Sequence, residues 1–211
     1  MFNKHAPIIN FLNCDNNYFK MELTQKQREI IKQVHDFVQR ESKKSEVNDE
    51  IDIFNYHILN VVRFSEMLAD KYNANKFVVI LASYLHDIVY IQTSNHETHE
   101  IIGAGFVKTY LSKFNIPKEE IDLVSLCVLN HRGSKKSKKE SVEEKIVASA
   151  DAMDHIDRCL SMLYRSGNKD FNSALEFMKG KIKRSWEKIE LTKAKEIIKP
   201  KYEAARVLFE F

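Results

Sequence analysis

The sequence predicts an all-α fold, a helical bundle that forms one domain, and three observations lead to this prediction. The 211 residues include only five glycines and three prolines, fewer turn-forming residues than a β-rich chain requires. Apolar residues recur at helical spacing through most of the chain, and no segment alternates as a strand does. The length suits a single continuous core, and no long linker divides the chain.

The first 20 residues are rich in asparagine and have no clear period, so we expect an N-terminal extension, with residues 21–211 as the domain. Thr24 can cap the first helix. The segment "KFVVILASYLHDI" is apolar nearly all round, which is typical of a central helix. Pro117 suits a first helical turn. We expect helices over about 24–42, 52–72, 76–88, 96–114 and 117–131, with "YIQTSN" as a loop before the fourth.

A capping box formed by Ser141 and Glu144 predicts the start of a long helix that Gly167 ends. The C-terminal helices, residues 168–211, are expected as one helix before Gly180 and one or two after it. Pro200 would kink the last of them.

Composition excludes several classes of protein. The net charge of +3, from 33 basic and 30 acidic side chains, is too balanced for a dedicated nucleic-acid-binding protein. The three cysteines are far apart and form no CxxC pair, so we expect a reducing, cytoplasmic setting without disulfides. The most apolar stretch, 77–91, is too short to span a bilayer, so no membrane partner is expected. The oligomeric state stays open, with a homodimer as one option.

Four histidines and two aspartates form an ordered series along the predicted helices. Polar side chains among core residues are costly unless something binds them, and a divalent metal is the usual partner. Mixed imidazole and carboxylate ligands suit Mn, Fe, Zn or Ni better than Ca. The series consists of His57, His86, Asp87, His99, His131 and Asp151.

This series resembles the defining pattern of the HD superfamily of metal-dependent phosphohydrolases. The flanking segments agree with it: "LASYLHDI", "HEIIGA" (99–104), "LNHRG" (129–133) and "ASADAMD" (148–154). The resemblance covers about residues 52–165, the motif core. It implies an HD-domain helical bundle in which the metal ligands are His57, His86, Asp87 and Asp151.

The resemblance also implies a function: hydrolysis of a phosphate ester or anhydride of a small phosphorylated metabolite, with a nucleotide as the leading candidate, by a metal-activated water. The cofactor would be one or two divalent ions among Mn, Fe, Mg, Zn and Ni. With one ion, His99 and His131 contact the substrate; with two, they bind the second ion. The alternatives are a di-iron HD-fold oxygenase and a non-catalytic metal-binding regulatory domain.

Further side chains are candidates for catalysis or substrate binding. Besides His99 and His131, the carboxylates of Glu100 and Asp154 are candidates to orient ligands or donate protons. The candidates for phosphate binding are Arg132, Lys135 and Arg158. Helix-surface carboxylates, a solvated lysine loop and ordinary ion pairs are the simpler explanations. His155 is expected to be structural or solvated. Asn60 stands where the single-metal pyrophosphohydrolase branch tends to carry an arginine, which leaves a phosphate-binding role there in doubt.

Overall fold

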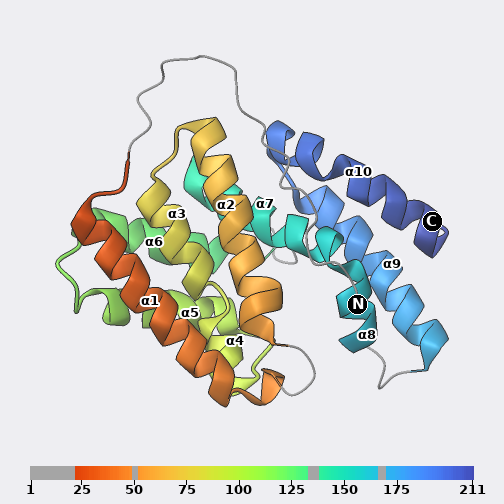
Figure 1. The fold of residues 1–211 in the computed structure, drawn as a ribbon, viewed down its shortest axis with the longest axis horizontal. Helices are drawn as coiled ribbons and strands as arrows, with labels where there is room; N and C mark the ends of the chain where they lie inside the picture. The colour runs from red at the N-terminus through yellow and green to blue at the C-terminus, as the bar shows by residue number, and fades with distance from the viewer. Residues whose placement is uncertain (1–21, 49–51, 133–137, 166–169) are drawn as a thin grey trace, which may run out of the picture.

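The computed structural model describes residues 22–48, 52–132, 138–165 and 170–211, and every secondary-structure element in these ranges is a helix (Figure 1). The predicted all-α class is therefore confirmed. The α-helices are α1 Gln25–Lys44, α2 Leu59–Tyr72, α3 Lys76–Leu85, α4 Ile88–Thr93, α5 His99–Leu111, α6 Lys118–Asn130, α7 Val142–Asp157, α8 Cys159–Arg165, α9 Phe171–Lys188 and α10 Thr192–Phe209. The expected N-terminal extension lies outside the described residues. None of the described helices is long and apolar enough to cross a membrane.

Helix α3 is the centre of the bundle, as its all-round apolar sequence predicts. Every side chain from Phe77 to Leu85 is buried. Helices α1, α2, α6 and α7 all pack against it. The Asn75 side chain caps its N-terminus by accepting a hydrogen bond from the Val78 backbone N–H. The end of α3 is therefore held in the interior of the protein.

The chain departs from the expected single helix over 76–88. Helix α3 ends at Leu85, His86 and Asp87 form a turn, and α4 begins at Ile88. Asp87 has φ −109° and ψ 13°, which takes it out of helical geometry. Helix α4 occupies much of the segment expected to be a loop, because Ile88 and Ile91 are buried against the core.

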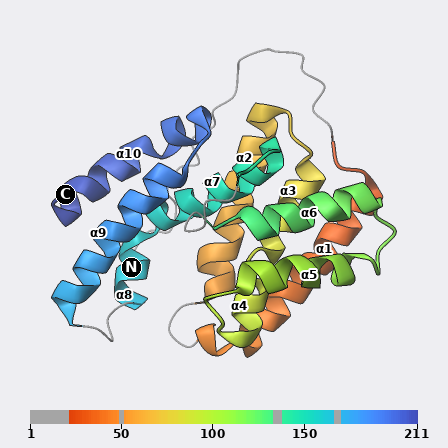
Figure 2. The same cartoon turned by 180° about the vertical axis from the view of Figure 1, so that it is seen from behind.

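Helix α7 connects the bundle of α1–α6 to the C-terminal helices α9 and α10. Ser141 and Glu144 form the predicted capping box at its start, and Glu144 also accepts a hydrogen bond from the Asn130 side chain at the end of α6. From there α7 runs out of the α1–α6 bundle to pack against α9 and α10 (Figures 1 and 2). It ends at Asp157, earlier than expected, because Arg158 leaves helical geometry; Gly167 lies outside the described residues.

The expected break at Gly180 is wrong, because α9 continues through it. A glycine inside a helix costs only about 1 kcal/mol relative to alanine. The buried face of α9, formed by Ala174, Met178, Ile182 and Ser185, outweighs this cost. The chain instead leaves the helix at Ile189, and α10 then continues through Pro200 to Phe209.

Truncation of α3 should destabilise the whole fold. Leu81 is fully buried, so Leu81→Ala should lower the free energy of unfolding by about 2–5 kcal/mol, measured by urea denaturation. The control is Leu208→Ala, at a side chain that is 58% exposed, which should cost less than about 0.5 kcal/mol. Equal losses in the two variants would contradict a core centred on α3.

Candidate metal centre

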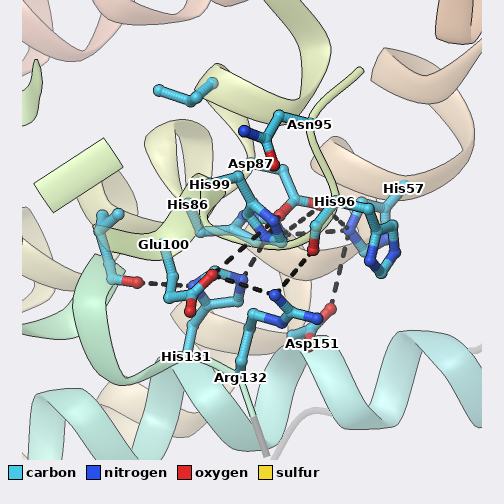
Figure 3. Close-up of polar contacts among 12 residues, drawn as sticks. His57, His86, Asp87, Asn95, His96, His99, Glu100, His131, Arg132 and Asp151 are labelled. Carbon is cyan, nitrogen blue, oxygen red and sulfur yellow. Dashed lines mark hydrogen bonds and ion pairs between the residues drawn. The ribbon is translucent and has the colours of Figure 1, made fainter. Parts of the chain in front are cut away.

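Four imidazoles converge on the carboxylate of Asp87 (Figure 3). His57 comes from a π-helical turn, Phe54–Ile58, that precedes α2. His86 adjoins Asp87 in the turn after α3, His99 is the first residue of α5, and His131 follows the last residue of α6. Helix ends that are distant in the sequence thus place these four histidines around one carboxylate. Short π-helical turns, such as the one that carries His57, are frequent at functional sites.

The two oxygens of Asp87 face different pairs of histidines. Oδ2 lies 3.4 Å from His57 Nε2 and 3.5 Å from His86 Nε2. Oδ1 lies 3.1 Å from His99 Nε2 and 3.4 Å from His131 Nε2. Each pair of histidines forms, with Asp87, a group whose potential ligand atoms lie within 4.8 Å of one another. One carboxylate is thus shared by two potential cation sites.

Three of the four imidazoles have Nδ1 engaged on the side away from Asp87. His57 Nδ1 lies 2.6 Å from Asp154 Oδ2. His86 and His131 each place Nδ1 on the backbone carbonyl three residues earlier, at 2.8 and 2.6 Å. An Nδ1–H that donates leaves the lone pair on Nε2, and this is the usual state of a metal-ligating histidine.

The donor set fits a divalent metal. The Nε2 atoms of His57 and His86 lie 3.1 Å apart, and with both Nδ1 atoms donating, their lone pairs face each other. A cation between them removes this repulsion. Imidazole nitrogens together with a carboxylate are the ligands of Mn, Fe, Zn and Ni sites. The residues present therefore match the metal that the sequence predicts.

His99 differs from the other three histidines. Its Nδ1 is buried and makes no hydrogen bond with the described part of the chain. Glu100 Oε2 lies 3.9 Å away, which is beyond hydrogen-bond distance. The ring is therefore held less firmly than the other imidazoles, and the group that contains it is the less preorganised of the two.

Asp151 of α7 lies at the edge of this cluster. Its Oδ1 is 3.7 Å from His57 Nε2 and 3.4 Å from His155 Nε2. Its Oδ2 accepts a hydrogen bond of 2.6 Å from Lys188 Nζ. The sequence prediction missed both of these neighbours. His155 stands four residues after Asp151, a spacing that places it on the same face of α7, whereas no local pattern points to Lys188.

The charges of the cluster shift the pKa values of its members in opposite directions. Burial alone would lower the pKa of His57, but the carboxylates of Asp154 and Asp87 raise it to about 10. Burial lowers the pKa of His86 to about 4. Burial opposes ionisation of Asp87 and Asp151, yet neighbouring histidines, joined at Asp151 by Lys188, hold both pKa values well below their usual range. The pocket therefore favours two ionised carboxylates and a positive charge at His57 Nε2, which either a proton or a divalent cation can supply.

Asp154 lies behind His57 and belongs to a second polar network. Its Oδ1 accepts a hydrogen bond of 2.6 Å from the buried Asn60 amide, which also donates to Asp157 at 3.0 Å. Arg63 in turn donates to the Asn60 carbonyl oxygen. Arg158 Nε lies 3.1 Å from Asp154 Oδ1. Asn60, the departure from the single-metal pattern, thus serves to hold the carboxylate that orients His57.

The remaining candidates lie beside the cluster or outside the described residues. Arg132 Nη1 donates to the backbone carbonyls of His96 and Glu97, at 2.8 and 3.2 Å, and lies 3.1 Å from the buried Glu100 carboxylate. Arg132 therefore fixes the segment before α5, which passes over the site in Figure 3. Lys135 lies outside the described residues.

Comparison with known proteins agrees with this geometry. The family model for the HD domain matches residues 54–156. No curated protein gives a significant match. Among solved structures, YpgQ from Bacillus subtilis in complex with ADP is 22% identical, with a TM-score of 0.66 over 88% of this chain and 94% of that chain.

Two further solved structures share the fold. An HD-superfamily hydrolase from Bacillus thuringiensis is 19% identical, with a TM-score of 0.68 over 87% of this chain and 95% of that chain. A predicted HD-superfamily hydrolase from an uncultured Thermotogales bacterium is 17% identical, with a TM-score of 0.60 over 85% and 88%. The family model thus identifies an HD domain in this chain at residues 54–156, and the chain shares its fold with solved HD-superfamily hydrolases.

Proposed function

We propose that this enzyme hydrolyses a phosphate ester or anhydride of a small phosphorylated metabolite, with a nucleotide as the leading candidate. The observation that carries the proposal is the position of Asp87, whose two oxygens each face a pair of imidazole Nε2 atoms. Divalent ions held there would polarise a phosphoryl group and supply an activated water near neutral pH.

The geometry favours two ions over one. The first would be held by His57, His86 and Asp87, with Asp151 beside them, and the second by Asp87, His99 and His131. Because His99 lacks a partner for Nδ1 among the described residues, we expect the second ion to bind more weakly than the first.

Side chains around the cluster would prepare it for catalysis. Asp154 holds His57 Nδ1 and so aims Nε2 at the metal position. Arg132 Nη1 donates hydrogen bonds to the segment before α5. Its other guanidinium nitrogens make no hydrogen bond with the described residues, and we propose that they bind a phosphate. Arg158 forms an ion pair with Asp154, and we propose it as a further substrate-binding residue. Glu100, buried against Arg132, would position that arginine.

A nucleotide substrate is supported by the ADP complex of YpgQ, whose fold this chain shares. The oxygenase alternative would use the same pair of metal positions. The two reactions differ in their need for dioxygen.

The first prediction here concerns metal content. The purified protein, loaded with Mn or Fe, should hold two ions per chain by elemental analysis. His99→Ala should hold one, because it removes a donor only from the second group. His96→Ala is the matched control, since this neighbouring histidine belongs to neither group, and it should still hold two. One ion in both wild type and His99→Ala would contradict the two-ion proposal and place His99 on the substrate side.

The second prediction concerns the reaction. Mn- or Fe-loaded wild type should release phosphate or pyrophosphate from at least one member of a nucleotide panel, at equal rates with and without oxygen. EDTA should abolish turnover, and His57→Ala should lower kcat/KM by at least about 100-fold, since it removes a ligand of the first ion. Turnover that requires oxygen would favour the oxygenase. If the metal-loaded protein turned over no phosphorylated compound, the result would favour the alternative of a non-catalytic regulatory domain.

The third prediction tests the residue behind His57. Asp154→Asn keeps the shape of the side chain but removes the charge that holds His57 Nδ1, so metal affinity should fall by about 10–100-fold in a metal titration. Asp122→Asn removes an exposed carboxylate that pairs with Lys108, on the part of α6 before the helix end that carries His131, and should leave affinity unchanged. Unchanged affinity in Asp154→Asn would show that His57 needs no orienting partner.

A further inference from the structure

Helix α9 lies outside the matched HD domain, yet one of its faces adjoins the metal centre. Lys188 Nζ donates to Asp151 Oδ2 at 2.6 Å, and Ser185 Oγ lies 3.3 Å from His155 Nδ1. Lys181 stands four residues before Ser185 and seven before Lys188, so the three side chains share one face of the helix. The face of α9 that carries Lys181, Ser185 and Lys188 thus packs against the side of α7 that carries Asp151 and His155.

Lys181 and Lys188 differ in how their charge is satisfied. Lys188 has the Asp151 carboxylate as its partner. Lys181 is half-buried, and it makes no hydrogen bond or ion pair with the residues that the structure describes. A partly desolvated ammonium that forms no ion pair lowers the free energy of unfolding. We therefore look for a role of Lys181 other than stabilising the fold.

The carboxylates that interact electrostatically with Lys181 belong to the candidate metal centre. Burial lowers the pKa of Lys181, while the carboxylates of Asp151 and Asp87 oppose this shift. Burial, Arg132 and, more weakly, Lys181 lower the pKa of His96, which lies on the segment over the site. Lys181 therefore shares the face of α9 that contacts α7 through Ser185 and Lys188, and it interacts electrostatically with Asp151 and Asp87 of the candidate centre.

We propose that Lys181 binds a phosphate oxygen of the substrate, so that α9 supplies a cation of the phosphate site that the HD motif does not include. This inference rests on the proposed function. An ammonium with three donors suits the oxygens of a phosphate held against a metal. Phosphate would also supply the counter-ion that Lys181 lacks among the described residues. Lys188 acts through Asp151 and is a positioning residue.

The test measures binding of inorganic phosphate, a product that is not turned over, to the Mn-loaded full chain by calorimetry. Lys181→Met should weaken phosphate binding by about tenfold, as expected for the loss of one charge-assisted hydrogen bond. Lys181→Arg should restore affinity to within about threefold of wild type, because it keeps the charge. Lys183→Met, at an exposed lysine of the same helix, is the matched control and should bind as wild type does.

Metal content and thermal stability are measured on the same samples. Lys181→Met should keep the wild-type metal content, and its Tm should be equal or higher by about 2–4 °C, because the variant removes a half-buried cation. Phosphate should raise Tm less in this variant than in wild type. Weaker phosphate binding in a variant of undiminished stability is the result expected for a substrate ligand, and a purely structural lysine would not give it.

Other outcomes have distinct meanings. Wild-type phosphate affinity in Lys181→Met with full metal content would overturn the inference and leave the proposed function intact. Loss of metal from Lys181→Met would assign Lys181 to the metal ligands and also overturn it. A metal-loaded wild type that neither binds phosphate nor hydrolyses any phosphorylated compound would overturn the proposed function itself, and the inference with it.

Discussion

The carboxylate of Asp87, ionised in a buried place, is the constraint on which the rest of the site depends. Burial opposes its charge, and the imidazoles around it compensate. Helix α3 fixes where this charge lies, because its side chains from Phe77 to Leu85 are all buried and close packing resists a shift of the helix. The turn that follows then frees Asp87 from helical geometry, so that its two oxygens can face two pairs of histidines. The same turn explains how the adjacent residues His86 and Asp87 can both point toward one metal position.

Helix α7 supplies the other half of the constraint. Asp151, Asp154 and His155 lie on it within about one turn, and each contacts a different partner: the Lys188 ammonium, the His57 ring and the Ser185 hydroxyl. Helix α7 packs against both the α1–α6 bundle and α9, and Lys188 of α9 contacts the candidate metal ligand Asp151 directly. Helix α9 therefore contributes contacts to the candidate site, although the family model ends at residue 156.

Local signals in the sequence predicted most of what is local in the structure. The capping box at Ser141, the all-round apolar α3 and the ordered histidines each depend on a few neighbouring residues, and the structure brings five of the six predicted ligand candidates into two compact groups. Errors arose where tertiary burial decides. Burial of Ile88 and Ile91 forms α4 in an expected loop, and the buried face of α9 carries the helix through Gly180. The Asp151 to Lys188 pair spans 37 residues, and no local pattern contains it.

Asn60 and the lysines of α9 bear on a single question, which is where the positive charge for a phosphate comes from. The single-metal pyrophosphohydrolase branch, from which this chain departs at Asn60, tends to place an arginine three residues after the first histidine. Here a buried amide occupies that position, and its nitrogen is committed to Asp154 and Asp157. A phosphate bound at the metals would still need a cation, because metal ligation leaves some of its oxygens unpaired. Lys181 lies on the same face of α9 as Lys188, so the proposed contact with phosphate would supply the cation that Asn60 does not, and would explain why this lysine is half-buried.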